Sequence, residues 1–403
     1  MKKLYLFLVL LNLAILMSCN ENTLELLSND GVAPGIVEII SVTPLHGGFE
    51  VEFKQPSDND LLYIKAEYDL IGGVKGEVQV SYFENKLKVM GFGNTDERTA
   101  KIYAVDRSGN MSAPVEINAS PLVPPIRLVQ DSLTITADFG GARFTWINRY
   151  EAPISIEIFA EDTITHKLTK VNTVYTSQLM SKYSIRNMKS IPTKFAAVIR
   201  DRWDNVSDTI KPQGEKLTPL FEQKFDKTKM RKVVLTSDTG WSAWGFKYEN
   251  LFDDNFTTHA HTQGDHPWPQ IFTIDLGVKA KLSRFRVYQR DVDGSNHWLY
   301  THGNPKKYDV YGAAVMPADP NDLSQWQKLR EVCISTKPSG PGSQVTDEDR
   351  VHALNGDEFD FDQLAYPSEI RYFRLVVWET WDGSGFVDFA ELSWWGNIIE
   401  VYN

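Results

Sequence analysis

One stretch of the sequence, residues 290–298, concentrates side chains that could bind a small polar ligand. It opens with Arg290, closes with His297 and Trp298, and carries an asparagine and two aspartates between them. Arginine and asparagine can hydrogen-bond neighbouring hydroxyl groups, and an indole offers an apolar face with one polar edge. Such a set would suit a sugar ring, with its hydroxyls on the guanidinium and its C–H face on the indole. The alternative for any single tryptophan is packing in the core or in a loop.

Three further side chains are expected beside this stretch, because other loops of the same region could carry them there. They are His261, Trp268 and Trp381, the last of which lies at a loop tip just past a strand-like segment. Nine of the 11 tryptophans and six of the eight histidines follow residue 240. This concentration, rather than any one residue, indicates a binding surface in the C-terminal part of the chain.

The histidines could also form a metal site. His259 and His261 would point the same way from a strand, and His266 could complete a zinc-binding set. No cysteine lies close to them in the sequence. We therefore expect histidines that serve a turn or contact the ligand, with zinc as the alternative.

Catalysis is a further alternative, because acidic residues occur in the same loops. Asp291 with Asp293, or Glu379 with Asp382, could supply the two carboxyl groups that glycosidases need, although sequence alone does not give their separation. The chain contains no Gly-x-Ser-x-Gly, no His-Glu-x-x-His and no phosphate-binding glycine loop. We expect a binding protein and not an enzyme.

The overall charge argues against nucleic acid as a partner. The 403 residues include 42 Lys and Arg against 53 Asp and Glu, which gives a formal charge of −11. Nucleic-acid binding calls for a basic surface, because phosphate contacts supply most of the affinity. An acidic protein would also need some other means of staying on an anionic membrane.

The N-terminus predicts export and a lipid anchor. Two lysines precede an apolar run over residues 4–17, which is too short for a membrane span and is typical of a signal peptide over residues 1–18. The sequence Leu-Met-Ser-Cys ending at Cys19 resembles a bacterial lipobox, which implies lipid attachment at Cys19 and a tether over residues 19–35. An ordinary cleaved signal is the alternative. Cys333, the second of the two cysteines, is expected to be a buried, inert thiol.

Two repeats of alternating strands follow the tether. Val51 and Phe53 follow a Gly-Gly turn, and Phe144 and Trp146 follow another one 93 residues later. Polar turns that begin at Asp106 and at Asp201 are 95 residues apart, and asparagine and aspartate suit such turns because they bond their own backbone. The repeats resemble fibronectin type III-like domains of bacterial surface proteins, over residues 36–120 and 121–215. We interpret them as spacers.

The third domain, residues 220–403, has alternating strands over 271–276, 282–290 and 371–379, long loops and no convincing helix, which favours a jelly roll. The predicted fold class is therefore all-β, with two sandwiches and one jelly roll.

The motifs Asn-Leu-Phe-Asp-Asp-Asn-Phe-Thr-Thr, Ile-Asp-Leu-Gly and Ala-Glu-Leu occur in that order. They resemble the discoidin domain, also called the coagulation factor V/VIII type C domain, whose galactose-binding-like fold is shared by family 32 carbohydrate-binding modules.

This resemblance implies a structural Ca²⁺ site built from the first turn and the closing Ala-Glu. Its side chains would come from Asp253, Asn255, Thr258 and Glu391. The family usually has glycine after the first aspartate, where this chain has Asp254, so a hydrogen-bonded turn without metal is the alternative. The resemblance also implies sugar contacts from an arginine near a strand end and a nearby aromatic side chain, which Arg290 and Trp298 match.

The whole architecture resembles the surface glycan-binding lipoproteins of Bacteroidetes polysaccharide-utilisation systems. That resemblance implies an outer-membrane lipoprotein exposed at the cell surface, a glycan ligand and a TonB-dependent importer complex as partner. The expected function is non-catalytic binding of oligo- or polysaccharide in support of uptake. The alternatives are a protein–protein adhesion or scaffold module and, with less support, a glycan-active enzyme.

Overall fold

The computed structural model describes residues 31–241, 243–264, 267–292, 297–330, 332–342, 344–361 and 368–402. The predicted signal peptide and Cys19 lie outside this range. The chain divides into two compact units. The first comprises the residues up to Ile135 with Phe144–Tyr183 and Lys194–Glu215, and the second comprises Thr136–Arg143, Ser184–Thr193 and the residues from Lys216 onward. None of the helices in the described ranges is both long and apolar enough to cross a membrane.

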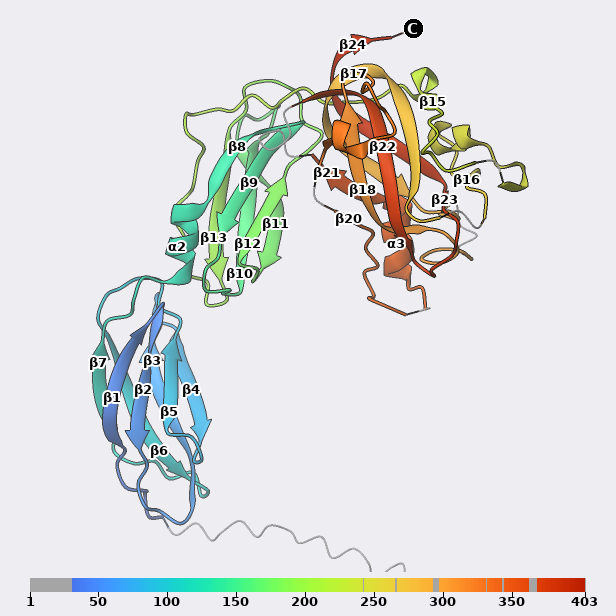
Figure 1. The fold of residues 1–403 in the computed structure, drawn as a ribbon. Coiled ribbons are helices and arrows are strands. Elements are labelled where there is room, and N and C mark those ends of the chain that lie inside the picture. Colours follow the sequence, from blue (N-terminus) through green and yellow to red (C-terminus); the bar gives the residue numbers. More distant parts are fainter. Residues whose placement is uncertain are drawn as a thin grey trace, which may run out of the picture. The chain divides into compact units, whose positions relative to one another are not determined.

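The first repeat folds as a sandwich of two antiparallel sheets, as the alternating pattern predicts (Figure 1). One sheet has the order β1-β2-β5, formed by β1 (Glu38–Leu45), β2 (Gly48–Lys54) and β5 (Lys86–Met90). The other has the order β4-β3-β6-β7, formed by β3 (Leu61–Asp69), β4 (Lys75–Ser81), β6 (Arg98–Asp106) and β7 (Val115–Ala119). Val51 and Phe53 of β2 are buried in the core, because alternate side chains of a strand face the same side.

The second repeat has the same architecture, preceded by a short helix α2 (Pro125–Ser132). Its sheets have the orders β12-β9-β8 and β11-β10-β13. The strands are β8 (Thr134–Asp138), β9 (Gly141–Ile147), β10 (Ile154–Glu161), β11 (Leu168–Thr176), β12 (Met180–Ser184) and β13 (Phe195–Asp201). Phe144 and Trp146 of β9 are buried, as Val51 and Phe53 are in the first repeat.

The polar turns that revealed the repeat are built alike. One carboxylate oxygen of Asp106 accepts hydrogen bonds from the backbone N–H groups of Ser108 and Asn110, both at 2.8 Å, and the other accepts from the Asn110 side chain at 2.9 Å. Asp201 accepts from the backbone of Trp203 at 2.8 Å and of Asn205 at 3.0 Å, and from the Asn205 side chain at 2.9 Å. These side chains close a turn, which confirms the structural interpretation of the motif.

The C-terminal part is a jelly roll whose main sheet has the order β14-β24-β17-β22-β18-β19 (Figure 1). These strands are β14 (Gln223–Lys224), β17 (Gln270–Tyr288), β18 (Pro305–Ala313), β19 (Gln327–Lys328), β22 (Glu369–Thr380) and β24 (Glu391–Val401). Three short strands pair beside this path, namely β15 (Arg231–Val233), β20 (Cys333–Ile334) and β21 (Asp357–Asp360). A separate pair joins β16 (Ala260–His261) to β23 (Asp388–Phe389). The fold is therefore all-β, with two fibronectin type III-like sandwiches and a jelly roll.

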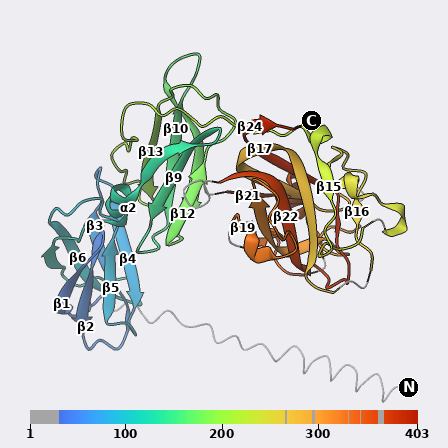
Figure 2. The same ribbon diagram turned by 45° about the horizontal axis from the view of Figure 1, so that its top comes forward.

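β17 is one strand where the sequence predicts two. It runs beside β22 and β24, and Figure 2 shows it between them. The pattern is interrupted at Gly277, whose φ is +67°, and the pairing register with β22 shifts between Asp275 and Ala280. A bulge of this kind bends a strand without ending it, so the glycine that predicted a turn marks a bend within β17.

The third domain contains a helix that the sequence analysis did not predict. α3 (Asp347–Asn355) begins with a capping box, in which Thr346 and Asp349 satisfy each other's backbone N–H groups. Only Asp349 and Ala353 of α3 are buried, so the helix has no apolar stripe that periodicity could detect. The described residues also include the 3₁₀ turns η1 (Lys227–Lys229), η2 (Ala243–Gly245), η3 (Tyr248–Phe252) and η4 (Leu323–Gln325).

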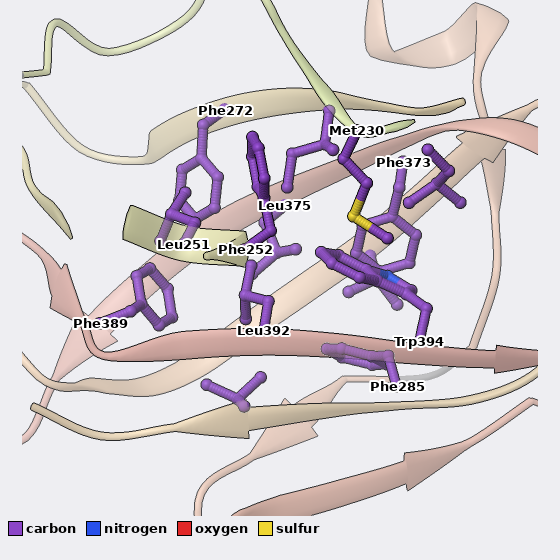
Figure 3. Packing of buried hydrophobic residues seen from close by; sticks show 14 of the residues in the cluster. Met230, Leu251, Phe252, Phe272, Phe285, Phe373, Leu375, Phe389, Leu392 and Trp394 are labelled. Atoms are coloured by element: carbon purple, nitrogen blue, oxygen red, sulfur yellow. The ribbon is translucent and has the colours of Figure 1, made fainter. Parts of the chain in front are cut away.

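An aromatic core holds the jelly roll together (Figure 3). Phe285 of β17 lies 5.3 Å from Phe373 of β22, and Phe373 lies 5.4 Å from Trp394 of β24, between ring centroids. Burial of such rings accounts for much of a domain's stability. Cys333 is also buried in this core, as predicted, and burial raises the pKa of its thiol to about 12.

Candidate ligand-binding site

The strands β16 and β23, the end of β17 and the residues just before β18 meet at one edge of the jelly roll. The β16–β23 pair places His261 opposite Asp388. Arg290 follows the end of β17 by two residues, and His302 lies just before β18. His261, His302 and Asp388 each offer a ligating atom, and these atoms lie within 4.8 Å of one another. The pairing of the short strands and the end of β17 therefore create the cluster.

Arg290 lies at the centre of this cluster. Its Nη1 is 3.2 Å from Oδ2 of Asp388, and its guanidinium carbon lies 5.6 Å from the centre of the Trp298 ring. The buried side chain of Asn304 positions both neighbours, because it accepts a hydrogen bond from the Arg290 backbone and donates one to the Trp298 carbonyl, both at 2.7 Å. Within the described part of the chain, Nε of Arg290 has no hydrogen-bond partner.

Aromatic rings form the adjoining surface. Trp298 is 38% exposed and stacks on His302 with ring centroids 4.1 Å apart. His302 meets the edge of Phe386 at 5.1 Å, and Phe386 stacks on His261 at 4.5 Å. Phe246 stacks on the same His261 with ring centroids 6.3 Å apart, and it also lies 3.9 Å from His259. The outermost ring, Trp298, thus presents an indole surface that is supported from behind by other rings.

The histidines of the cluster are neutral near pH 7. Burial, reinforced by the charge of Arg290, lowers the pKa of His259 to about 4. Burial and Arg290 also lower the pKa of His302, and burial is the main cause of the lowered pKa of His261. A neutral imidazole has one donor and one acceptor nitrogen, so it can pair with either end of a hydroxyl group.

Asp388 is fully buried opposite Arg290. Burial raises the pKa of its carboxyl to about 8, while the Arg290 charge opposes that rise. Oδ1 of Asp388 has no hydrogen-bond partner within the described residues. Arg290 and Asp388 thus form a largely buried polar pair within the cluster.

The set His261, His302 and Asp388 has donor types that suit zinc. It differs from the predicted set, because it includes His302 and Asp388, while His266 lies outside the described residues and His259 contacts Phe246. The guanidinium of Arg290, 3.2 Å from Asp388, already supplies the positive charge that a metal would bring to this carboxyl. The arrangement suits the hydroxyls of a polar ligand better than a cation.

The structure places some of the predicted ligand residues in the cluster, some beside it, and Trp381 in a different contact. His261, Arg290 and Trp298 belong to the cluster, and His297 is an exposed neighbour of Trp298. Trp268 is 39% exposed and lies two residues before Gln270, whose side chain contacts Thr262 and Gly385 beside the cluster. Trp381 instead packs edge-on against Tyr300 at 5.2 Å and donates from its indole N–H to Ser335 at 3.3 Å.

Three contributors were absent from the predicted set, namely His302, Phe386 and Asp388. His302 follows Trp298 by four residues, so its proximity could have been inferred from the sequence. Phe386 and Asp388 directly precede the closing Ala-Glu motif, but only the pairing of β23 with β16 brings them to His261. No local pattern carries that information, because the two strands are more than 120 residues apart.

The acidic residues considered for catalysis have other contacts. Glu379 lies 3.6 Å from the ammonium of Lys307, and both side chains are largely exposed. Asp382 accepts hydrogen bonds from the backbone N–H groups of His302 at 2.8 Å and Ser384 at 3.0 Å, which hold the loop. Asp293 lies outside the described residues. Asp291 lies 3.8 Å from Nε of Arg290.

The residues predicted for calcium lie in the first turn and at the start of β24. Asp253 accepts hydrogen bonds from the backbone N–H of Asn255 at 2.9 Å and from the hydroxyl of Thr258 at 2.7 Å. Glu391 is fully buried, and its Oε1 lies 3.0 Å from Nζ of Lys227. A lysine thus contacts the carboxylate that was expected to bind the metal.

A wide groove also lies on the second sandwich. It encloses about 1030 Å³ and is lined by residues that include Trp146, Tyr175 and Met180. Its lining lacks the arginine–aspartate pair and the stacked imidazoles that distinguish the cluster in the jelly roll. We therefore place the candidate site at the jelly-roll cluster.

Three family models, each described as a domain of unknown function, match consecutive parts of the chain. They are DUF4959 over residues 34–121, DUF5126 over residues 122–228 and DUF5000 over residues 248–396. No curated protein matches the chain.

Several solved structures are similar to the chain. A SusE-like protein is 30% identical and covers 68% of this chain and 100% of its own, with a TM-score of 0.44. The C-terminal domain of a chitobiase from Bacteroides fragilis is 19% identical and covers 44% of this chain and 100% of its own, with a TM-score of 0.31. A CBM32 module of a family 31 glycoside hydrolase from Clostridium perfringens is 17% identical and covers 43% of this chain and 94% of its own, with a TM-score of 0.30.

Proposed function

The chain belongs to the family of the SusE-like protein, to which it is 30% identical along that protein's whole length, and on this premise we propose that it binds carbohydrate without catalysis at the bacterial cell surface. The observation that carries the proposal is the pairing of a half-exposed indole, Trp298, with the guanidinium of Arg290 at 5.6 Å. A sugar ring has an apolar C–H face and polar edges, and this pair matches both.

The rest of the cluster supports the same ligand chemistry. The neutral imidazole of His302, which is partly exposed, can donate to or accept from a hydroxyl group of the ligand. His302 and Phe386 support the indole from behind, so its orientation is set before the ligand arrives. A preorganised surface loses less entropy on binding than a mobile one does. The structural roles of Glu379 and Asp382 support binding without hydrolysis.

The proposed location follows from the N-terminal sequence. Cys19 would carry the lipid that holds the protein on the outer membrane, and the two sandwiches would separate the jelly roll from that anchor. Captured oligosaccharide would then pass to a TonB-dependent importer complex. Fractionation tests the first step, because Cys19→Ala should move the protein from the membrane to the soluble fraction.

Affinity electrophoresis against a broad panel of polysaccharides tests the proposed binding. We expect at least one polysaccharide to retard the wild-type protein, and Trp298→Ala to abolish that retardation. Trp378→Ala is a matched control, because Trp378 is 42% exposed, similar to Trp298, but donates to Asp309 from the strand β22. The proposal fails if no polysaccharide retards the protein or if Trp298→Ala is retarded as the wild type is.

A further inference from the structure

One of the side chains expected to bind calcium in the jelly roll, Glu391, is contacted by a lysine. Lys227 belongs to η1, and only 3% of its side chain is exposed. Its Nζ lies 3.0 Å from Oε1 of Glu391 and 2.8 Å from Oδ1 of Asp254. A buried ammonium is costly unless carboxylates surround it, so these two contacts account for its position.

Asp254 is the residue at which the sequence departs from the family pattern. It occupies the position of the usual glycine, and its φ of +58° is the left-handed conformation that glycine adopts most readily. The structure shows what the aspartate contributes there, because its carboxylate meets Lys227 and also Lys224, each at 2.8 Å. The aspartate that replaces the usual glycine and the buried Lys227 are therefore the two partners of one salt bridge.

The remaining expected ligands do not complete a calcium shell. Ca²⁺ requires six to eight oxygen atoms, each at about 2.3–2.6 Å. Asp253 and Thr258 are hydrogen-bonded to each other, and Asn255 accepts from the backbone of Thr257 at 3.0 Å. Oε2 of Glu391 is the carboxylate oxygen left without a hydrogen-bond partner within the described residues. A divalent cation bound there would lie close to the ammonium and be repelled by it.

We propose that the ammonium of Lys227 takes the place of the structural Ca²⁺ in this jelly roll. The monovalent cation is supplied by the chain itself, and it joins the turn at Asp254 to the first residue of β24. Glu391 is the first residue of β24 and lies three residues after Asp388 of β23, so the salt bridge anchors the chain directly after the strand that carries Asp388. The folded jelly roll is then independent of calcium.

Thermal unfolding of the whole protein tests this inference without reference to any ligand. We expect the midpoint of the wild-type protein to be the same in excess EDTA and in excess CaCl₂. A midpoint that falls in EDTA and recovers with CaCl₂ would overturn the proposal. Since this measurement needs neither a variant nor a sugar, it stands apart from the test of carbohydrate binding.

A variant tests the role of the lysine directly. Lys227→Ala leaves Glu391 buried without its cation and vacates the space beside it, so we expect a lower midpoint that CaCl₂ partly restores. Lys224→Ala is the matched control, because Lys224 contacts the same Asp254 carboxylate while its side chain is 46% exposed. We expect the control to show little change and no response to CaCl₂. Equal midpoints for Lys227→Ala and the wild type would contradict the proposal.

Discussion

At the scale of single residues, Arg290 links the parts of the candidate site. It contacts the buried carboxylate of Asp388, its backbone is held by Asn304, and its guanidinium faces the ring of Trp298. A guanidinium can make several directed hydrogen bonds at once, whereas an ammonium is a compact point charge. Arg290 therefore contacts Asp388 and faces Trp298 at the same time, an arrangement that the ammonium of a lysine would not reproduce.

This argument predicts that Arg290→Lys weakens polysaccharide binding although it keeps the charge. We expect the dissociation constant, measured by calorimetry on a polysaccharide that retards the wild type, to rise by at least roughly tenfold. Arg286→Lys is the control, since Arg286 pairs with Glu358 and Tyr288 and not with Asp388. Wild-type affinity in Arg290→Lys would show that the fork geometry of the arginine is not used.

At the scale of elements, the bend of β17 depends on Gly277. Gly277 has a φ of +67° and accepts a hydrogen bond from the backbone N–H of Tyr402 at 2.9 Å, just beyond the end of β24. A β-carbon at this position would overlap the carbonyl oxygen of Lys229. The local sequence shows a glycine after an apolar run, but only the packing against Lys229 explains why no other residue fits.

We predict that Gly277→Ala destabilises the jelly roll strongly. The positive φ alone costs about 1 kcal/mol for alanine, and the overlap with a backbone oxygen adds to it. Gly340→Ala separates the two effects, because Gly340 has a φ of +81° but open space around it. In chemical denaturation, the loss of unfolding free energy should be clearly larger for Gly277→Ala. Equal losses for the two variants would mean that the backbone at Lys229 yields to the added methyl group.

At the scale of the whole molecule, the chain repeats one sandwich design and then changes to another fold. The turns at Asp106 and Asp201 have the same hydrogen bonds 95 residues apart, so both the repeat and its local structure were predictable from sequence.

The jelly roll contains Cys333, the second of the chain's two cysteines, in its buried core. A buried thiol with a raised pKa is a poor nucleophile, so its reactivity reports whether this domain is folded.

In the Cys19→Ala variant, Cys333 is the sole thiol. We predict that Ellman's reagent does not label the native protein near neutral pH and labels one thiol per chain in denaturant, because burial both excludes the reagent and raises the pKa to about 12. Labelling during a thermal ramp should follow the unfolding of the jelly roll. Rapid labelling of the native protein would show that the strand β20 opens without global unfolding.

The sequence by itself determined the all-β class, the repeat and many of the strands, because alternation and turn chemistry act over a few residues; it did not show that β17 continues past Gly277 or that α3 forms. It also predicted Arg290 and Trp298, which are eight residues apart, as ligand contacts, and this stays a prediction. It did not show that Asp388 faces Arg290, that Trp381 packs against Tyr300, or that Lys227 meets Glu391. Each of these contacts joins distant segments through strand pairing and core packing. Only the tertiary structure decides them, because their partners are neighbours in space and not along the chain.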